Sequence, residues 1–150
     1  MKSISVTTEI SAPIEAVWAE LSGVDAYAAW NPFITSFAGE LSVGSRVEVR
    51  IAPPGGRPMT FRPTITELTP EHRIEWVGRF LVRGLVDGRH SFTLDGLEDG
   101  RTRLTQAEEF SGVLVPVMAS MLARTREGFA AMNEAVRLRA EAATTVPTAR

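Results

Sequence analysis

The sequence predicts an α+β domain with an antiparallel sheet of about six or seven strands, two short helices after the first strand, and one long C-terminal helix. Three observations support this fold class. Several segments alternate polar and β-branched or aromatic residues with a period of two, as strands with one wet face do. Turns rich in glycine and proline separate these segments. The C-terminal part then carries apolar residues at three- and four-residue spacings, which is typical of an amphipathic helix.

The N-terminal part is predicted to form a strand followed by two short helices. β-Branched residues alternate over residues 2–10, which indicates a half-buried strand. Pro13 stands where a first helical turn tolerates proline, and the helix that follows is predicted to end at Gly23. Asp25 is predicted to cap a second short helix. That helix should stop at Asn31, because a residue before proline is pushed out of the α region.

The central part is predicted to form a meander of antiparallel strands, because each alternating segment is followed by a turn signal. The predicted strands cover residues 45–52, 59–68, 73–80, 85–94 and 102–110.

The last element is predicted to be a helix of roughly 25 residues, about 37 Å long, that follows Pro116. Its apolar face must be buried against something nearly as long, and the sheet is the available partner. The residues on that face are Met118, Leu122, Phe129, Met132 and Val136. Residues 1–143 are therefore predicted to form one domain and residues 144–150 a disordered tail.

The composition argues against several classes of function. The chain has 150 residues and a formal net charge of -2, with arginines scattered among the acids, so we expect no nucleic-acid partner. It contains no cysteine, which excludes disulfides and thiolate metal sites. It also lacks a long apolar run, so we expect a cytoplasmic protein without stable membrane insertion. The two histidines lie apart, at His72 and His90, and the sequence predicts no metal site and no cofactor. The oligomeric state stays open.

The order of elements resembles the START-like superfamily, also called SRPBCC or polyketide cyclase/dehydrase-like, whose helix-grip fold wraps a curved sheet around a long helix. The resemblance is carried by "APIEAVWAELSGVDAYAAWNPF" (12–33), "IEWVGRF" (74–80), "HSFTL" (90–94) and "RLTQAEEFSGVL" (103–114). It implies a cavity between sheet and helix that holds a hydrophobic small molecule. Such a cavity would measure roughly 300–1,000 Å³.

Three polar residues are predicted to share the inward face of the sheet. If Phe92 points inward, the period of two turns His90 inward, and the same phase turns Gln106 and Glu108 inward with Leu104. A buried carboxylate needs a donor, nearby water or a proton. Glu108 is therefore either the polar anchor or acid/base group of a ligand site, with His90 and Gln106 as hydrogen-bonding partners, or a structural group bonded to the backbone.

Three charged residues are predicted to lie on the wet face of the sheet. The alternation of its strand places Arg62 outward, although a bulge at Pro63 would turn it inward toward Glu108 or a ligand carboxylate. Glu75 and Arg79 are predicted to be surface residues as well.

The predicted ligand-binding residues combine the apolar inner face with these polar groups. Trp30 is included although packing between the short helices and the sheet is its favoured role. The set comprises Trp30, Phe61, Trp76, His90, Phe92, Gln106, Glu108, Met118, Leu122 and Phe129.

Three classes of function are compatible with these residues. The first is a carrier or sensor that encloses a lipid, isoprenoid or polyketide-like molecule. The second is a polyketide cyclase or dehydratase that uses Glu108 and His90 as acid and base. The third is a protein-interaction module, which would need a large exposed apolar patch that the charged strand faces do not provide.

Overall fold

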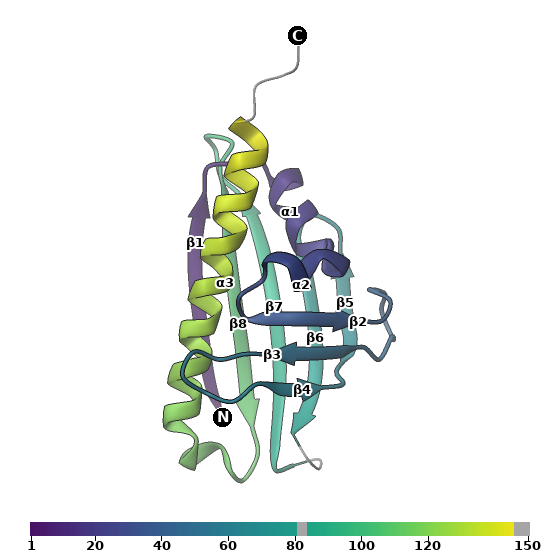
Figure 1. Ribbon diagram of the computed structural model, residues 1–150, viewed down its shortest axis with the longest axis vertical. Helices are drawn as coiled ribbons and strands as arrows, with labels where there is room; N and C mark the ends of the chain where they lie inside the picture. The colour runs from purple at the N-terminus through teal and green to yellow at the C-terminus, as the bar shows by residue number, and fades with distance from the viewer. Residues whose placement is uncertain (81–83, 146–150) are drawn as a thin grey trace.

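A computed structural model of the chain describes residues 1–80 and 84–145. It confirms the predicted α+β class and the helix-grip arrangement, in which strands surround one long helix (Figure 1). The elements are β1 (Lys2–Ile10), α1 (Ile14–Ser22), the 3₁₀ helix η1 (Val24–Ala26), α2 (Tyr27–Trp30), β2 (Ile34–Ala38), β3 (Glu48–Ile51), β4 (Met59–Phe61), β5 (Thr64–Thr69), β6 (Arg73–Phe80), β7 (Val86–Gly96), β8 (Thr102–Ser111), the 3₁₀ helix η2 (Val115–Val117) and α3 (Ala119–Thr145).

The strands form two antiparallel sheets. Five strands pair in the order β1-β8-β7-β6-β5, and three pair in the order β2-β3-β4. Figure 1 shows the three short strands lying across the five long ones. The single strand expected over residues 59–68 is two strands, because Pro63 has no N–H for a ladder and interrupts the pairing. β4 therefore belongs to the small sheet and β5 to the large one.

The C-terminal helix is longer and begins later than the sequence predicted. α3 covers Ala119–Thr145, 27 residues or about 40 Å. Met118, expected on the helix, lies just before it at the end of η2. Residues 144 and 145 were expected in the tail but are helical, and residues 146–150 lie outside the described part of the chain.

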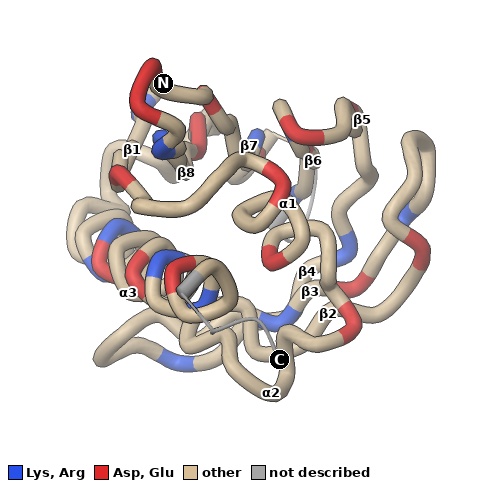
Figure 2. Tube along the Cα trace, turned by 90° about the horizontal axis from the view of Figure 1, so that it is seen from above, with Lys and Arg blue, Asp and Glu red and all other residues tan. Residues whose placement is uncertain are grey.

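The buried face of α3 holds the helix in the fold. The side chains of Phe129, Met132 and Val136 are fully buried, as the spacing predicted. Burying a side chain of this size contributes about 1.5–3 kcal/mol. Beside this face, Arg139 donates from Nε to Glu20 of α1 at 2.7 Å. Charges of both signs follow one another along α3 (Figure 2).

The segment around Asn31 does more than end a helix. α2 stops at Trp30 as predicted, and Asn31 is extended with φ -80° and ψ 117°. Its Oδ1 accepts hydrogen bonds from the backbone N–H groups of Phe33 and Ile34 at 2.9 and 2.8 Å. Asp25, expected as a helix cap, instead lies within η1 and makes no side-chain capping bond. The turn is thus fixed by Asn31.

This turn directs Phe33 onto α3. The Phe33 ring is 1% exposed and lies 5.5 Å from the ring of Phe129. A Cβ added to Gly128 would stand 2.2 Å from the Phe33 ring. Gly128 is therefore the position that lets the small sheet approach the helix this closely.

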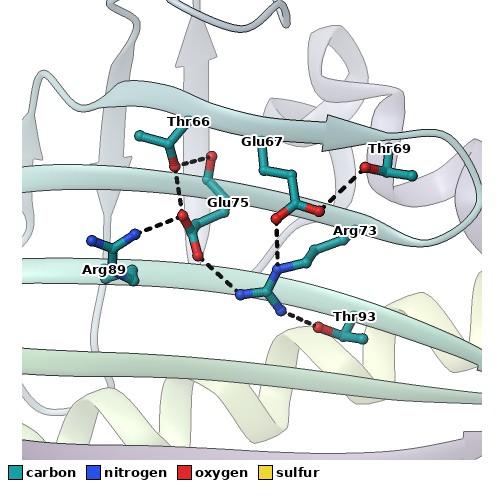
Figure 3. A network of polar contacts seen from close by, with 7 residues as sticks. All are labelled: Thr66, Glu67, Thr69, Arg73, Glu75, Arg89 and Thr93. Carbon is teal, nitrogen blue, oxygen red and sulfur yellow. Dashed lines mark hydrogen bonds and ion pairs between the residues drawn. The ribbon is translucent and has the colours of Figure 1, made fainter.

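The outer face of the large sheet carries a network centred on Glu75 (Figure 3). Glu75 was expected to be a surface residue, but it is only 8% exposed. Its carboxylate accepts from Thr66 Oγ1 at 2.8 Å, from Arg73 at 2.9 Å and from Arg89 at 2.8 Å. The surface prediction failed because long side chains from neighbouring strands cover the carboxylate, and strand phase alone does not show this.

The network also sets the charge state of Glu75. Burial alone would raise the pKa of Glu75, but hydrogen bonds from Thr66 and Arg73 and the charge of Arg89 together lower it below its ordinary value. A lowered pKa in the folded state means that stability is gained above the pKa of the unfolded chain. It is lost as pH falls through the folded pKa.

We expect Glu75→Gln to lower the free energy of unfolding at pH 7 by about 1–3 kcal/mol, because two arginines then lose a charged acceptor. Urea unfolding at pH 7 and at about pH 3 measures this, and the gap between wild type and variant should shrink at the lower pH. Glu98→Gln, at an exposed turn position, is the control and should change little. An equal gap at both pH values would contradict the assigned role of the carboxylate.

Candidate functional site

A cavity of about 70 Å³ lies between the two sheets and the start of α3. Four predicted ligand-binding residues line it: Phe61, Trp76, His90 and Glu108. The rest of the lining was not singled out from the sequence as a ligand site. These residues are Phe33, Ile34, Val49, Ile51, Pro63, Gly78, Arg79, Val86, Gly88, Phe110, Met121 and Thr125.

Two glycines explain why a hollow exists at this place. Gly78 of β6 pairs directly with Gly88 of β7. Both follow the inward phase of Trp76 and His90, which are themselves paired two residues away. The inner face therefore lacks two neighbouring side chains at this level. The sequence signal was available, as a glycine in each of two adjacent strands, but the register that brings them together is not readable from the sequence.

The carboxyl group of Glu108 lies over one of these glycines. A Cβ added at Gly88 would stand 2.3 Å from Glu108 Oε2. The Glu108 side chain is 18% exposed and lines the cavity. The inward phase predicted for Glu108 is thus what the structure shows.

The other six predicted ligand-binding residues lie outside the lining. Phe92, Gln106 and Phe129 are buried behind it and contact His90. Leu122 is buried in a separate apolar cluster, and Met118 packs against that cluster.

Trp30 is placed by packing. Its ring lies 5.4 Å from that of Tyr27, and the guanidinium of Arg139 lies 5.1 Å from its centroid. Trp30 closes the contact between α2 and α3, in line with the packing role favoured for it, and does not reach the cavity.

A chain of hydrogen bonds leads from the cavity into the protein. His90 Nδ1 lies 3.3 Å from Glu108 Oε1, and His90 Nε2 lies 3.0 Å from Gln106 Oε1. Gln106 Nε2 donates to Asn133 Oδ1 of α3 at 2.9 Å. Asn133 Nδ2 donates to the carbonyl oxygen of Val6 on β1 at 3.1 Å. Gln106 and Asn133 are fully buried, and Asn133 was not identified from the sequence.

The backbone end of this chain fixes the direction of every hydrogen bond. A carbonyl oxygen can only accept, so Asn133 must present its NH₂ group to Val6 and its oxygen to Gln106. Gln106 then offers its own oxygen to His90. It follows that His90 carries a hydrogen on Nε2 and donates it to Gln106.

This direction constrains the pair formed by His90 and Glu108. With Nε2 protonated, a neutral imidazole presents a bare Nδ1 to Glu108, and two bare acceptors do not attract each other. The 3.3 Å contact is a hydrogen bond only when a hydrogen lies between His90 Nδ1 and Glu108 Oε1.

The arginine whose orientation the sequence left open lies outside. Arg62 forms an ion pair with Glu48 at 3.1 Å, and its side chain is 62% exposed. It does not approach Glu108, because β4 keeps the phase that turns Phe61 inward. Arg79, predicted at the surface, is exposed and also contributes to the edge of the cavity.

Within residues 1–80 and 84–145, no group of three or more His, Cys, Asp or Glu side chains is placed to hold a metal ion. None of the described helices has both the length and the hydropathy needed to cross a membrane.

We expect His90 to be protonated at Nε2, because Gln106 can offer it only an acceptor. Two-bond ¹H–¹⁵N correlation spectra of the histidine side chains report this, and exposed His72 serves as an internal reference. In an Asn133→Leu variant the Gln106 amide keeps only its longer bond to the carbonyl oxygen of Phe129, at 3.4 Å, so the fixed Nε2–H pattern should weaken. If His90 of the wild type carried its only hydrogen on Nδ1, the direction assigned to these hydrogen bonds would be wrong.

Comparisons with known proteins agree with this architecture. The family described as polyketide cyclase / dehydrase and lipid transport matches residues 1–141. No curated protein matches the chain significantly in sequence. The Zhui aromatase/cyclase from Streptomyces sp. R1128 has a similar structure, with a TM-score of 0.78 and 18% identity over 97% of this chain and 96% of that one.

Two further solved structures share the fold. A START superfamily protein from Mycobacterium smegmatis has a TM-score of 0.71 and 19% identity, with 94% of this chain and 98% of that chain covered. DynU16, from the dynemicin biosynthetic locus, has a TM-score of 0.67 and 20% identity over 92% of this chain. The chain spans only 46% of DynU16. From the family match over residues 1–141, the chain belongs to the polyketide cyclase / dehydrase and lipid transport family.

Proposed function

We propose that this protein is a carrier or sensor that binds an apolar small molecule, such as a lipid, isoprenoid or polyketide-like compound, with one polar group directed to Glu108. The observation that carries the proposal is the paired glycines, Gly78 and Gly88, which leave an apolar space with the carboxyl group of Glu108 in its lining. A ligand site of this type combines apolar walls with a few fixed polar groups.

The walls and the polar end support this role. Trp76 stacks on His90 with centroids 5.0 Å apart and planes at 22°, which gives one flat rigid side. Met121 of α3 adds a flexible apolar side chain that adapts to different shapes. Both ring nitrogens of His90 are engaged, so Glu108 is the group with an oxygen available to a ligand hydroxyl or carbonyl.

The size of the cavity limits how a ligand is held. At about 70 Å³ the space is well below the roughly 300–1,000 Å³ of a pocket for a drug-sized molecule. Phe33, Phe92 and Phe129 fill much of the volume between sheet and helix. A ligand therefore places only a short apolar part inside, or side chains move to admit more of it.

We expect Gly78→Val to weaken the binding of 1-octanol by about tenfold or more, because the new side chain occupies the hollow. A Cβ at Gly78 meets only Pro63 at 3.5 Å, an ordinary contact, so the fold should persist. Isothermal titration calorimetry gives the affinities. Gly96→Val, in the same sheet with open space around it, is the matched control. If Gly78→Val and the wild type bound 1-octanol equally well, the cavity would not be the binding site. If the wild type did not bind 1-octanol, the proposed function would be refuted.

A second candidate function is catalysis of an aldol-type cyclisation of a poly-β-keto chain. It is favoured by the 3.3 Å contact between Glu108 and His90 and by the aromatase/cyclase activity named for the Zhui structure. Glu108 would remove the acidic α-proton, and the enolate carbon would attack a second carbonyl of the chain. The same proton would return to the alkoxide oxygen, so that the pair ends the cycle as it began.

For this second function we expect Glu108→Gln to lower turnover of a poly-β-ketone at least about 100-fold, because the amide cannot accept the proton. Single-turnover product analysis by mass spectrometry measures the loss. Glu109→Gln changes a neighbouring glutamate of the opposite phase and should keep full turnover. Turnover that survives in a Glu108→Gln, His90→Ala double variant would dismiss both assignments.

A further inference from the structure

A second hollow lies on the outside of the protein, next to the cavity. It measures about 580 Å³ and is lined by the end of β4, the start of β5, part of β6 and Arg46. Phe61, Gly78 and Arg79 line both spaces. Both spaces border the edge where β4 and β6 lie without pairing, since β4 pairs only with β3 and β6 only with β5 and β7. We call this shared edge the window.

Three arginines surround the outer side of the window. Arg46, Arg62 and Arg79 come from three different segments of the chain and are all exposed. The Nε of Arg46 donates to the backbone carbonyl oxygen of Arg62 at 3.3 Å, which holds the Arg46 side chain against the backbone at Arg62.

Acidic residues compensate this charge only in part. Glu48 pairs with Arg62. Asp87 lies opposite Arg79 on β7, but its carboxylate faces the backbone N–H of Gly84 at 3.3 Å. In the described part of the chain, neither Arg46 nor Arg79 has an acidic partner. Guanidinium groups without an acidic partner bind carboxylates and phosphates through paired N–H donors.

The polar groups that line the two spaces differ in kind. Glu108, over Gly88, presents carboxyl oxygens and no cation to a ligand in the cavity. The outer side of the window has the arginines. An apolar ligand with one anionic end would therefore enter with its apolar part first and leave its charge beside the arginines.

We propose that Arg46, Arg62 and Arg79 form a binding site for the anionic end of an amphipathic ligand, a carboxylate or a phosphate monoester, whose apolar chain enters the cavity through the window. This inference rests on the proposed binding function and specifies the ligand class. It also accounts for the small cavity, since most of an amphipathic molecule would lie in the window and the outer hollow.

The test compares ligands that share a chain and differ in the head group. Calorimetric titration of the full chain uses octanoate, octyl phosphate, 1-octanol and inorganic phosphate at low and high salt. We expect both octyl anions to bind about tenfold more tightly than 1-octanol at low salt and to lose this advantage at high salt. Inorganic phosphate alone should bind weakly, because it has no chain for the cavity. Phosphate binding as tight as that of octyl phosphate would overturn the coupling of window and cavity.

Variants assign the effect to the arginines. In the combined Arg46→Gln, Arg62→Gln, Arg79→Gln protein, we expect octanoate binding to fall about tenfold and 1-octanol binding to stay unchanged. Arg126→Gln, at an exposed position of α3 that lines neither hollow, is the matched control. An equal loss for octanoate and 1-octanol, or none for either, would overturn the inference.

The two proposals fail in different ways. Binding of 1-octanol with no preference for the octyl anions would overturn only the anion site. Absence of 1-octanol binding by the wild type would overturn the proposed function, and the anion site with it.

Discussion

The structure depends on one buried chain of hydrogen bonds that ties the long helix to the sheet. The Asn133 side chain extends from α3 and is fully buried. It bonds to Val6 of β1 and to Gln106 of β8. A buried polar group without a partner costs about 1–3 kcal/mol, so each member of the chain holds the next in place. Apolar packing would allow α3 to slide along the sheet, whereas these bonds allow one register only. The same bonds set the tautomer of His90, which contacts Glu108 through Nδ1.

The candidate site arises from side chains that are missing as much as from those present. Gly78 and Gly88 remove two neighbouring positions from the inner face, and Glu108 extends into part of the space they leave. Interior side chains normally fill such space to crystal-like density, so a hollow above paired glycines indicates a site for something else. Gly128 serves the opposite purpose at the other wall, where its missing side chain lets Phe33 pack directly on α3.

The division into two sheets places the apolar interior of the candidate site beside an outer edge that carries arginines. Pro63 interrupts the predicted strand, so β4 and β5 separate into different sheets and β6 faces β4 without a ladder. Inside this edge the walls are mostly apolar, with Glu108 and His90 as polar groups. Outside it, arginines exceed acids. In the proposed site, this arrangement selects ligands by both shape and charge.

The sequence alone determined the local features: strand phase, helix periodicity and the stop at Asn31. Because side chains alternate strictly along a strand, the inward direction of His90, Gln106 and Glu108 followed from their apolar neighbours. Only the tertiary structure decided which residues meet. The pairing of Gly78 with Gly88, the reach of Asn133 to Gln106 and the burial of Glu75 under its arginines all join segments distant in sequence. Register and crossing between elements are set by the packing of the whole chain, so no local pattern encodes them.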